Sequence, residues 1–209
     1  MCATPGVALC SSCVASFPRI SVPLCARCGA PTAWPVSRCR ECSGRRLAFA
    51  AARAAVLYDD GVRSLVAAWK QRGLRKLAAV AADVVAETVR PPSVDALVAV
   101  PPDGDRSVKR GHQPAARLAA ELGARWALPV VPVLGRARTI RAQRGLALAE
   151  RRRNVAGAFV PRGRAPPSVA LVDDVYTTGA TASAAAAALR AGGARRVEVV
   201  TFARAVRRR

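Results

Sequence analysis

The chain has 209 residues, of which 52% are hydrophobic, so it can bury one sizeable core and has room for a small additional module. Its 34 lysines and arginines outnumber 13 acidic residues, which leaves a net charge of +21. This excess favours phosphate-bearing partners and salt-sensitive contact with nucleic acid, although a coding bias toward arginine and alanine is an alternative explanation. No stretch approaches the roughly 20 apolar residues that cross a bilayer, and the N-terminus lacks a secretory signal pattern, so we expect a cytoplasmic protein without a membrane span.

All seven cysteines lie within the first 42 residues. They are Cys2 and three Cys-x-x-Cys pairs, Cys10/Cys13, Cys25/Cys28 and Cys39/Cys42. Two such pairs from separate turns can complete a tetrahedron of thiolates around one zinc ion, and the spacing of the second and third pairs suits a zinc ribbon. Disulfides are the alternative, which a reducing compartment disfavours. We therefore predict a structural Zn²⁺ on the second and third pairs.

Cys2, Cys10 and Cys13 supply three thiols, whereas a closed structural zinc site takes four. The Cys-x-x-Cys partner of Cys2 would fall before residue 1, so we expect the true translation start to lie upstream and a fourth ligand to complete a second zinc site. An open three-cysteine site and the lack of a second zinc are the alternatives. Residues 43–46 then form a short connection, which divides the chain into a zinc-ribbon module (1–46) and a second domain (47–209).

Beyond residue 46, apolar runs of strand character alternate with runs of helical character. The expected strands are 50–58, 96–101, 130–134, 169–172 and 197–202. The expected helices are 61–89, 113–122, 146–154 and 180–191. Strands that are apolar at consecutive positions and separated by helices predict an α/β domain with a parallel sheet covered on both faces. Ligands bind such sheets at the carboxyl ends of the strands, which directs attention to the loops after Val100 and Val172.

The loop after Val172 has the composition of a sugar-phosphate site. Asp173 and Asp174 end an apolar strand, and the turn after them opens a helix. The candidate residues of this turn are Thr177, Thr178, Gly179, Ala180 and Thr181. Helix N-terminal N–H groups and threonine hydroxyls favour a phosphate, Gly179 permits its close approach, and two carboxylates accept hydrogen bonds from sugar hydroxyls. A ribose 5-phosphate carries both groups, whereas a merely capped helix is the structural alternative.

This segment resembles the signature of the type I phosphoribosyltransferases, an apolar strand, two acids and then Thr-Thr-Gly-Ala/Ser-Thr, which binds phosphoribosyl pyrophosphate (PRPP). Over almost the whole chain, the order of motifs is similar to that of the ComF family of competence-associated proteins. The motifs that follow the cysteine pairs are Tyr58–Gly61, Trp69–Gly73, Val100–Pro101, Arg110–Gly111, Arg138–Thr139 and Asn154–Phe159. The resemblance implies a type I phosphoribosyltransferase fold with a central parallel sheet behind an N-terminal double zinc ribbon.

The resemblance further implies a pentosyl transfer, in which a nitrogen nucleophile displaces pyrophosphate from PRPP while Mg²⁺ stabilises the leaving group. Asp173 and Asp174 are then the catalytic carboxylates. Arg106, Lys109 and Arg110 are the candidates for binding the pyrophosphate group. The family usually reads Arg-Gly-Phe-Asn-Gln where this chain has 110–114, with His112, its only histidine, in place of the aromatic residue. A general-base role for His112 and a surface role both remain open.

Residues 136–153 and Lys70 each have two interpretations, a role at the site or simple exposure to solvent. Residues 136–153 are a lid over PRPP or a solvated basic surface. Lys70 follows the Lys-x-x-Gly pattern of the family, but a helical lysine can simply face solvent, so we assign it no role.

Three functions remain open from the sequence. The first is a phosphoribosyltransferase acting on an unidentified acceptor and linked to competence and DNA uptake. The second is a non-catalytic PRPP-binding protein, whose basic surface and zinc module contact single-stranded DNA or competence-machinery proteins. The third, a plain zinc-ribbon nucleic-acid binder, leaves Asp173–Thr181 unexplained. Aromatic residues make up only 4% of the chain, so electrostatic contact with DNA is favoured over base stacking.

Overall fold

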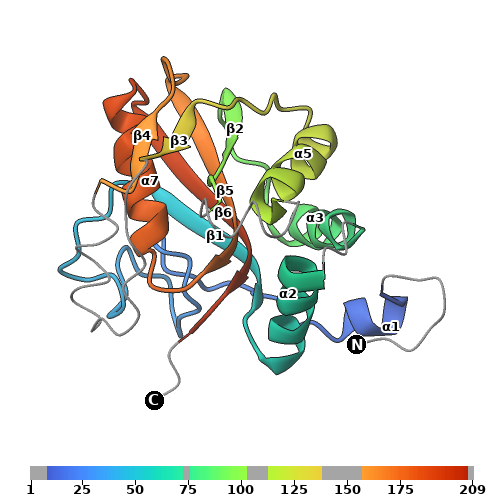
Figure 1. The fold of residues 1–209 in the computed structure, drawn as a ribbon. Helices are drawn as coiled ribbons and strands as arrows, with labels where there is room; N and C mark the ends of the chain where they lie inside the picture. Colours follow the sequence, from blue (N-terminus) through green and yellow to red (C-terminus); the bar gives the residue numbers. More distant parts are fainter. Residues whose placement is uncertain (1–8, 73–75, 103–112, 138–156, 207–209) are drawn as a thin grey trace, which may run out of the picture.

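A computed structural model describes residues 9–72, 76–102, 113–137 and 157–206. Its centre is a four-stranded sheet of order β1-β6-β5-β2, in which neighbouring strands are parallel (Figure 1). The strands are β1 (Ala51–Leu57), β2 (Ala96–Ala99), β5 (Ser168–Tyr176) and β6 (Arg196–Arg204). The two central strands, β5 and β6, are buried along most of their length. The runs of consecutive apolar residues predicted such a sheet, and the parallel pairing of all four strands confirms the α/β class.

Three helices cover one face of the sheet: α2 (Asp60–Arg72), α3 (Leu77–Thr88) and α5 (Pro114–Trp126) (Figure 1). Trp69 of α2 is fully buried and meets Phe202 of β6 edge to face, with ring centroids 6.5 Å apart. The sequence predicted one helix over 61–89, and the structure has two that flank residues 73–75, which lie outside the described residues. The expected helix 113–122 is α5, which extends four residues further.

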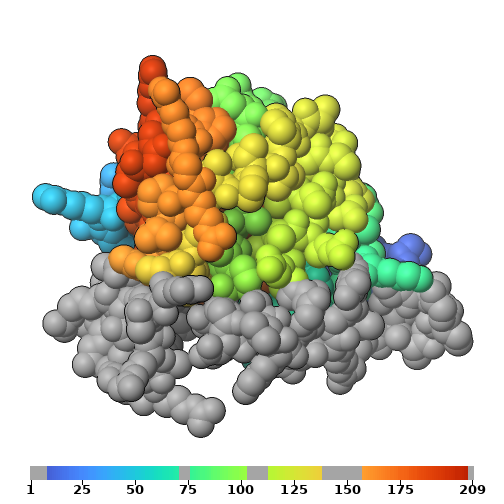
Figure 2. Space-filling model, turned by 45° about the horizontal axis from the view of Figure 1, so that its top comes forward, coloured from blue at the N-terminus to red at the C-terminus, as the bar shows by residue number. Residues whose placement is uncertain are grey.

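The opposite face carries α7 (Ala180–Ala191) and a small antiparallel pair, β3 (Leu134–Arg136) and β4 (Phe159–Pro161). In the space-filling view, residues 127–137 lie beside β4, with α7 next to them (Figure 2). The strand predicted over 130–134 is wrong in its bounds, since Val130 makes only an isolated bridge to Leu97 and pairing begins at Leu134. The helix predicted over 146–154 lies outside the described residues.

The N-terminal part begins with a short helix, α1 (Ser11–Ala15), and then runs antiparallel to β1. The Ile20 amide donates to the Ala55 carbonyl at 2.8 Å, and the Leu57 amide donates to the Pro18 carbonyl at 2.9 Å. The loops after Ile20 share a buried core with α7 and the sheet, a core that includes Cys25, Cys28, Cys42, Leu47, Phe49, Leu171 and Leu189. Apolar contacts therefore cross residue 46, and the domain boundary there stays a prediction. Among the described helices, none combines the length and the hydropathy that a membrane crossing requires.

Candidate functional site

Four cysteines from two loops of the N-terminal module converge in the structure. The Sγ atoms of Cys25, Cys28, Cys39 and Cys42 all lie within 4.8 Å of one another. The Sγ–Sγ distances are 3.6 Å for Cys25–Cys42, 3.5 Å for Cys28–Cys39 and 3.9 Å for Cys39–Cys42. A tetrahedron with Zn–S bonds of about 2.3 Å separates its sulfurs by about 3.8 Å, whereas a disulfide needs about 2.05 Å. The cluster therefore has the dimensions of a metal centre, as the spacing predicted, and we call it the four-cysteine centre.

The environment of these thiols suits a cation. Burial alone would raise the pKa of the Cys25 thiol, but backbone hydrogen bonds from Cys28, Cys39 and Arg27 lower it to about 6. One of these is the Cys39 amide, which lies 3.2 Å from Cys25 Sγ. Burial raises the pKa of Cys28 and of Cys42 above the usual range. A thiophilic cation is the group that offsets this desolvation, because it binds thiolates directly. Four converging thiols, of which Cys25, Cys28 and Cys42 are buried and Cys39 is half-buried, fit a structural Zn²⁺.

Cys10 and Cys13 do not join this centre. Cys10 is the N-cap of α1 and Cys13 lies within this helix, on the other side of the molecule from the loops that carry the centre (Figure 1). The metal-sized groups found among the described residues contain neither of them. Cys2 lies outside the described residues, so the second zinc site stays a prediction.

The two acids at the end of β5 have different surroundings. Successive side chains of a strand point to opposite faces of the sheet. Asp174 is 7% exposed and faces α2, where its Oδ2 pairs with Nζ of Lys70 at 2.7 Å. Asp173 lies half-buried, and its Oδ1 accepts a hydrogen bond from the Asp174 amide at 2.9 Å. Lys70 thus belongs to the site, although its helical position alone suggested solvent exposure.

Burial and the charge of Asp174 raise the pKa of Asp173 to about 7, while the Asp174 amide, Lys70 and Arg136 act in the opposite direction. Arg136 of β3 donates from Nε to the Pro101 carbonyl at 3.2 Å, and its guanidinium lies 4.9 Å from the Phe159 ring centroid. The site therefore brings together the ends of α2, β3 and β5. A carboxyl group that titrates near neutrality in such a place is a candidate for function.

The turn between β5 and α7 has the geometry of an anion site. Gly179 is the N-cap of α7 with φ +72°, in the left-handed region that favours glycine. The Ala180 amide lies 3.3 Å from Thr178 Oγ1, and Thr177 is exposed. Beneath the turn is a cavity of about 20 Å³, lined by Asp173, Thr177, Gly179, Thr181 and Thr201 among others. The turn thus places a carboxylate, hydroxyls and a helix N-terminus around one point.

Tyr176, the last residue of β5, fills the space below this turn. A Cβ atom at position 179 would overlap the Tyr176 phenol group, so only glycine fits there. The Tyr176 side chain is buried, and the Arg204 guanidinium lies 4.5 Å from its ring centroid. The shape of the turn therefore depends on residues beneath it that no sequence motif pointed to.

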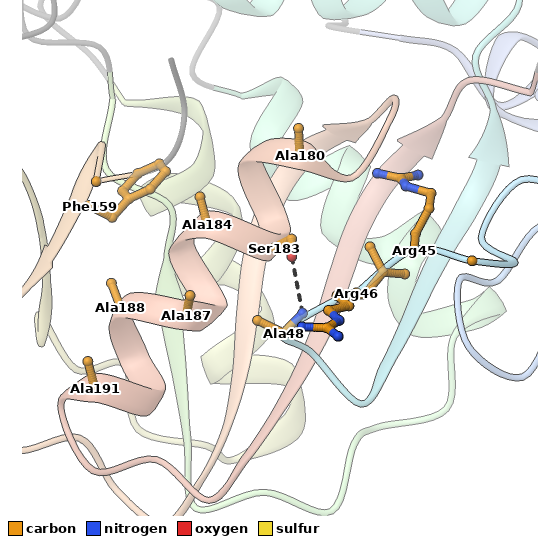
Figure 3. A pocket seen from close by; sticks show the side chains of 13 residues that line it. Arg45, Arg46, Ala48, Phe159, Ala180, Ser183, Ala184, Ala187, Ala188 and Ala191 are labelled. Atoms are coloured by element: carbon orange, nitrogen blue, oxygen red, sulfur yellow. Dashed lines mark hydrogen bonds between the residues drawn. The ribbon is translucent and has the colours of Figure 1, made fainter. Parts of the chain in front are cut away.

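A larger groove of about 710 Å³ runs along α7 (Figure 3). One side of the helix lines it with Ala180, Ala184, Ala187, Ala188 and Ala191. Arg45, Arg46 and Ala48 of the connection after the four-cysteine centre lie on one side of α7, and Phe159 of β4 lies on the other (Figure 3). The Ala48 amide donates to Ser183 Oγ at 3.1 Å, which ties this connection to α7.

Other predicted residues are not placed. Arg106, Lys109, Arg110 and His112 lie outside the described residues, as does 138–153 of the predicted lid. The missed contributors are Lys70, Arg136, Tyr176 and Arg204. Lys70 had a sequence signal in the Lys-x-x-Gly pattern, and Arg136 is the first residue of the predicted lid, whereas Tyr176 and Arg204 act through contacts between distant segments.

No family model matches the chain. It is 29% identical over 210 residues to Competence protein F of Haemophilus influenzae, and the match covers 94% of this chain and 90% of that protein. Among solved structures, it is similar to an allosteric regulatory enzyme of purine biosynthesis, at TM-score 0.43 and 18% identity over 61% of this chain. That match spans 25% of the enzyme. It is also similar to an adenine phosphoribosyltransferase, at TM-score 0.38 and 15% identity, over 68% of this chain and 75% of that one. The nearly full-length match to Competence protein F confirms the resemblance to the ComF family of competence-associated proteins that the order of motifs indicated.

Proposed function

We propose that this protein binds PRPP at the carboxyl end of β5 and transfers its phosphoribosyl group to an acceptor, in a role linked to competence and DNA uptake. One observation carries the proposal: Asp173 and Asp174 lie near the carboxyl end of β5, and the threonine-rich turn that follows opens α7 around a left-handed glycine. Asp59 and Asp60 also stand at the start of a long helix, α2, but there the Asp59 carboxylate caps the helix itself by accepting a hydrogen bond from the Val62 amide at 2.8 Å. A non-catalytic PRPP-binding protein that handles single-stranded DNA is the alternative.

The 5-phosphate would bind the turn itself. The first N–H groups of a helix have no partner within it, and their dipoles favour an anion. Thr177, Thr178 and Thr181 add hydroxyl donors, and Gly179 and Ala180 present backbone without a large side chain in the way. The cavity beneath the turn has room for about one water molecule, so the phosphate would lie on the outer side, where Thr177 is exposed.

The ribose hydroxyls would donate to the carboxylates. Asp173 is the better placed acceptor, because it lines the cavity together with Thr177 and Thr181, whereas Asp174 is held by Lys70. Hydroxyl donors stabilise the ionised form of a carboxyl group, so PRPP would lower the pKa of Asp173 from about 7. PRPP affinity should therefore rise as the pH increases through neutrality.

In the transfer step, the bond between the anomeric carbon and the pyrophosphate oxygen breaks, and the pyrophosphate leaves with the electron pair. A nitrogen of the acceptor forms the new bond to the anomeric carbon and loses its proton to water. Mg²⁺ bound to PRPP supplies charge neutralisation on the departing pyrophosphate. Arg106, Lys109 and Arg110 are the proposed protein cations for that group. Asp173 and Asp174 would hold the ribose and stabilise the positive charge that develops on its ring.

Calorimetry of PRPP with Mg²⁺ tests the site. Replacing Asp173 and Asp174 with alanine removes two charged acceptors, each worth about 1.5–3 kcal/mol, so affinity should fall by at least about tenfold. Asp60→Ala with Asp83→Ala is the matched control, because these acids are exposed and change the net charge equally. Unchanged affinity in the site variant would reduce the turn to a structural strand-to-helix connection.

Pyrophosphate release separates the transferase from the non-catalytic binder. The assay mixes the protein with PRPP, Mg²⁺ and candidate bases or oligonucleotides. Release that depends on one acceptor and disappears in Asp173→Asn supports transfer, whereas binding without release under every condition supports the alternative.

The net charge of +21 supports a further proposal, that the surface binds single-stranded DNA electrostatically. Oligonucleotide titrations at two salt concentrations test it. Affinity should fall steeply with salt and survive loss of the acid pair, while salt-independent affinity would contradict an electrostatic surface.

A further inference from the structure

The last residue of β6, Arg204, is a buried arginine at the junction of two sites. Its side chain is 2% exposed, among the lowest values of any charged side chain in the described part of the chain. Burying a charge is costly unless the charge is paired and hydrogen-bonded. The partners of Arg204 therefore show which parts of the molecule its position depends on.

On one side, the guanidinium contacts the four-cysteine centre. Nη1 donates to the Cys28 carbonyl at 2.5 Å. Nη2 lies 3.6 Å from Cys28 Sγ and 2.7 Å from Glu41 Oε2, and Glu41 is the residue before the ligand candidate Cys42. Arg204 thus holds both loops that form the centre.

On the other side, the guanidinium covers Tyr176 at the base of the proposed phosphate turn. Its Cζ lies 4.5 Å from the Tyr176 ring centroid, and the Phe49 ring meets the same tyrosine edge to face at 6.2 Å. The phenol group occupies the space next to Gly179. Contacts are therefore continuous from Cys28 through Arg204 and Tyr176 to Gly179.

A metal ion at the four-cysteine centre would fix the two loops that Arg204 contacts. One ion on all four sulfurs would tie Cys28, which accepts from the guanidinium, to Cys42, which follows the other acceptor, Glu41. Four thiolates around one Zn²⁺ would also place a net charge of −2 beside the guanidinium. Metal loading should therefore strengthen the hold on Arg204 and, through it, on Tyr176.

We infer that Arg204 is a positioning residue that couples the metal state of the four-cysteine centre to the shape of the turn at 177–181. The functional half of this inference rests on the proposed PRPP site. The structural half, the link between the centre and the turn, does not depend on PRPP. Because coupling between two binding sites is reciprocal, PRPP should strengthen zinc binding by the same factor that zinc strengthens PRPP binding, and we expect slower zinc release as its kinetic sign.

The first experiment measures zinc release from the purified full chain to a chromophoric chelator, with and without PRPP and Mg²⁺. We expect PRPP to slow release from the unaltered protein by at least about fivefold, the lower end of typical coupling. Arg204→Met should release zinc about 10–100-fold faster, and PRPP should no longer slow it. Arg204→Lys keeps the charge and should restore part of the PRPP effect, which a purely structural role would not require.

Two controls remove similar groups elsewhere. Arg196→Met lies at the opposite end of β6, where its guanidinium pairs with Glu198 at 2.8 Å in an exposed position. Ser183→Ala removes the hydrogen bond between Ala48 and α7. Both should keep the PRPP effect on zinc release. If Arg204→Met does not fold, Glu41→Gln removes the charged partner from the other side and should weaken the effect in the same direction.

The second experiment measures amide hydrogen exchange at residues 177–183 without PRPP. Exchange should be faster in zinc-loaded Arg204→Lys and Glu41→Gln than in the unaltered protein, and equal to it in Arg196→Met. Failure of PRPP to bind the unaltered protein would overturn the proposed function alone, and hydrogen exchange would then decide the coupling. The coupling is refuted if exchange in the turn is the same in all variants, or if bound PRPP leaves zinc release unchanged.

Discussion

Asp173→Asn should stabilise the protein while it weakens the proposed site. The carboxyl group of Asp173 is desolvated and lies next to the charge of Asp174, which raises its pKa from 3.8 to about 7. Asparagine has nearly the same shape, and its carbonyl oxygen can still accept the hydrogen bond from the Asp174 amide. The substitution therefore removes the charge and little else.

The magnitude follows from proton linkage. The folded protein binds the Asp173 proton more tightly than the unfolded chain, so this group destabilises the fold as the pH rises from about 4 to about 7. Three pKa units at 1.36 kcal/mol each give at most about 4 kcal/mol, fully expressed above pH 7. Asp173→Asn should gain about 1–4 kcal/mol of unfolding free energy at pH 8, and less at pH 5, where the carboxyl group is largely protonated in the fold.

Urea unfolding at pH 5, 6, 7 and 8 measures this gain. Asp95→Asn is the comparison, because the Asp95 carboxylate accepts a hydrogen bond from the Ser168 amide at 2.8 Å, at the start of the same strand. That variant should lose stability or remain unchanged. A gain for Asp173→Asn that does not shrink toward acid pH would refute the electrostatic explanation, and undiminished PRPP affinity would refute the functional one.

Three further predictions concern neighbouring contacts. Lys70→Met should cost about 1–3 kcal/mol in urea unfolding, less than a fully buried pair because Lys70 is one-third exposed, and adding Asp174→Asn should recover part of the loss. Gly179→Ala should lower both the melting temperature and PRPP affinity, because position 179 has φ +72° and faces Tyr176; unchanged values would contradict this packing. Cys39→Ser should reduce zinc in metal analysis from about one ion per chain toward none, whereas Cys10→Ser should leave the ion of this centre in place.

The sequence predicted elements correctly where the local pattern and the tertiary structure agree. The helix predicted over 180–191 is α7 with the same bounds, because a glycine flanks the alanine-rich run at each end. The four cysteines converge as their spacing predicted. The strand predicted over 169–172 is longer, since its apolar pattern stops at Val172 but pairing with β6 continues to Tyr176. Backbone pairing does not require apolar side chains, so the acids lie inside β5 rather than in a loop after it.

The supporting residues of the site could not be predicted, because their contacts join segments that are distant in the chain. The sequence of α2 does not distinguish Lys70 from a lysine that faces solvent. Only the packing of α2 against β5 brings its amine to Asp174. Arg204 is one arginine in a chain rich in them, near a basic C-terminus. Composition suggests a solvated charge there, whereas the strand pairing buries it between Tyr176 and Cys28.

The position of the site at the boundary between two cores explains why two adjacent acids differ. Asp174 faces the helical side, where its Oδ2 lies 2.7 Å from Nζ of Lys70. Asp173 faces the side that holds the turn, where no pair of comparable length is found among the described residues, and burial raises its pKa. A ligand with hydroxyl donors and a bound cation would supply what Asp173 lacks. The alternation of side chains along β5 therefore pairs Asp174 with Lys70 and makes Asp173 the better placed acceptor for the proposed sugar phosphate.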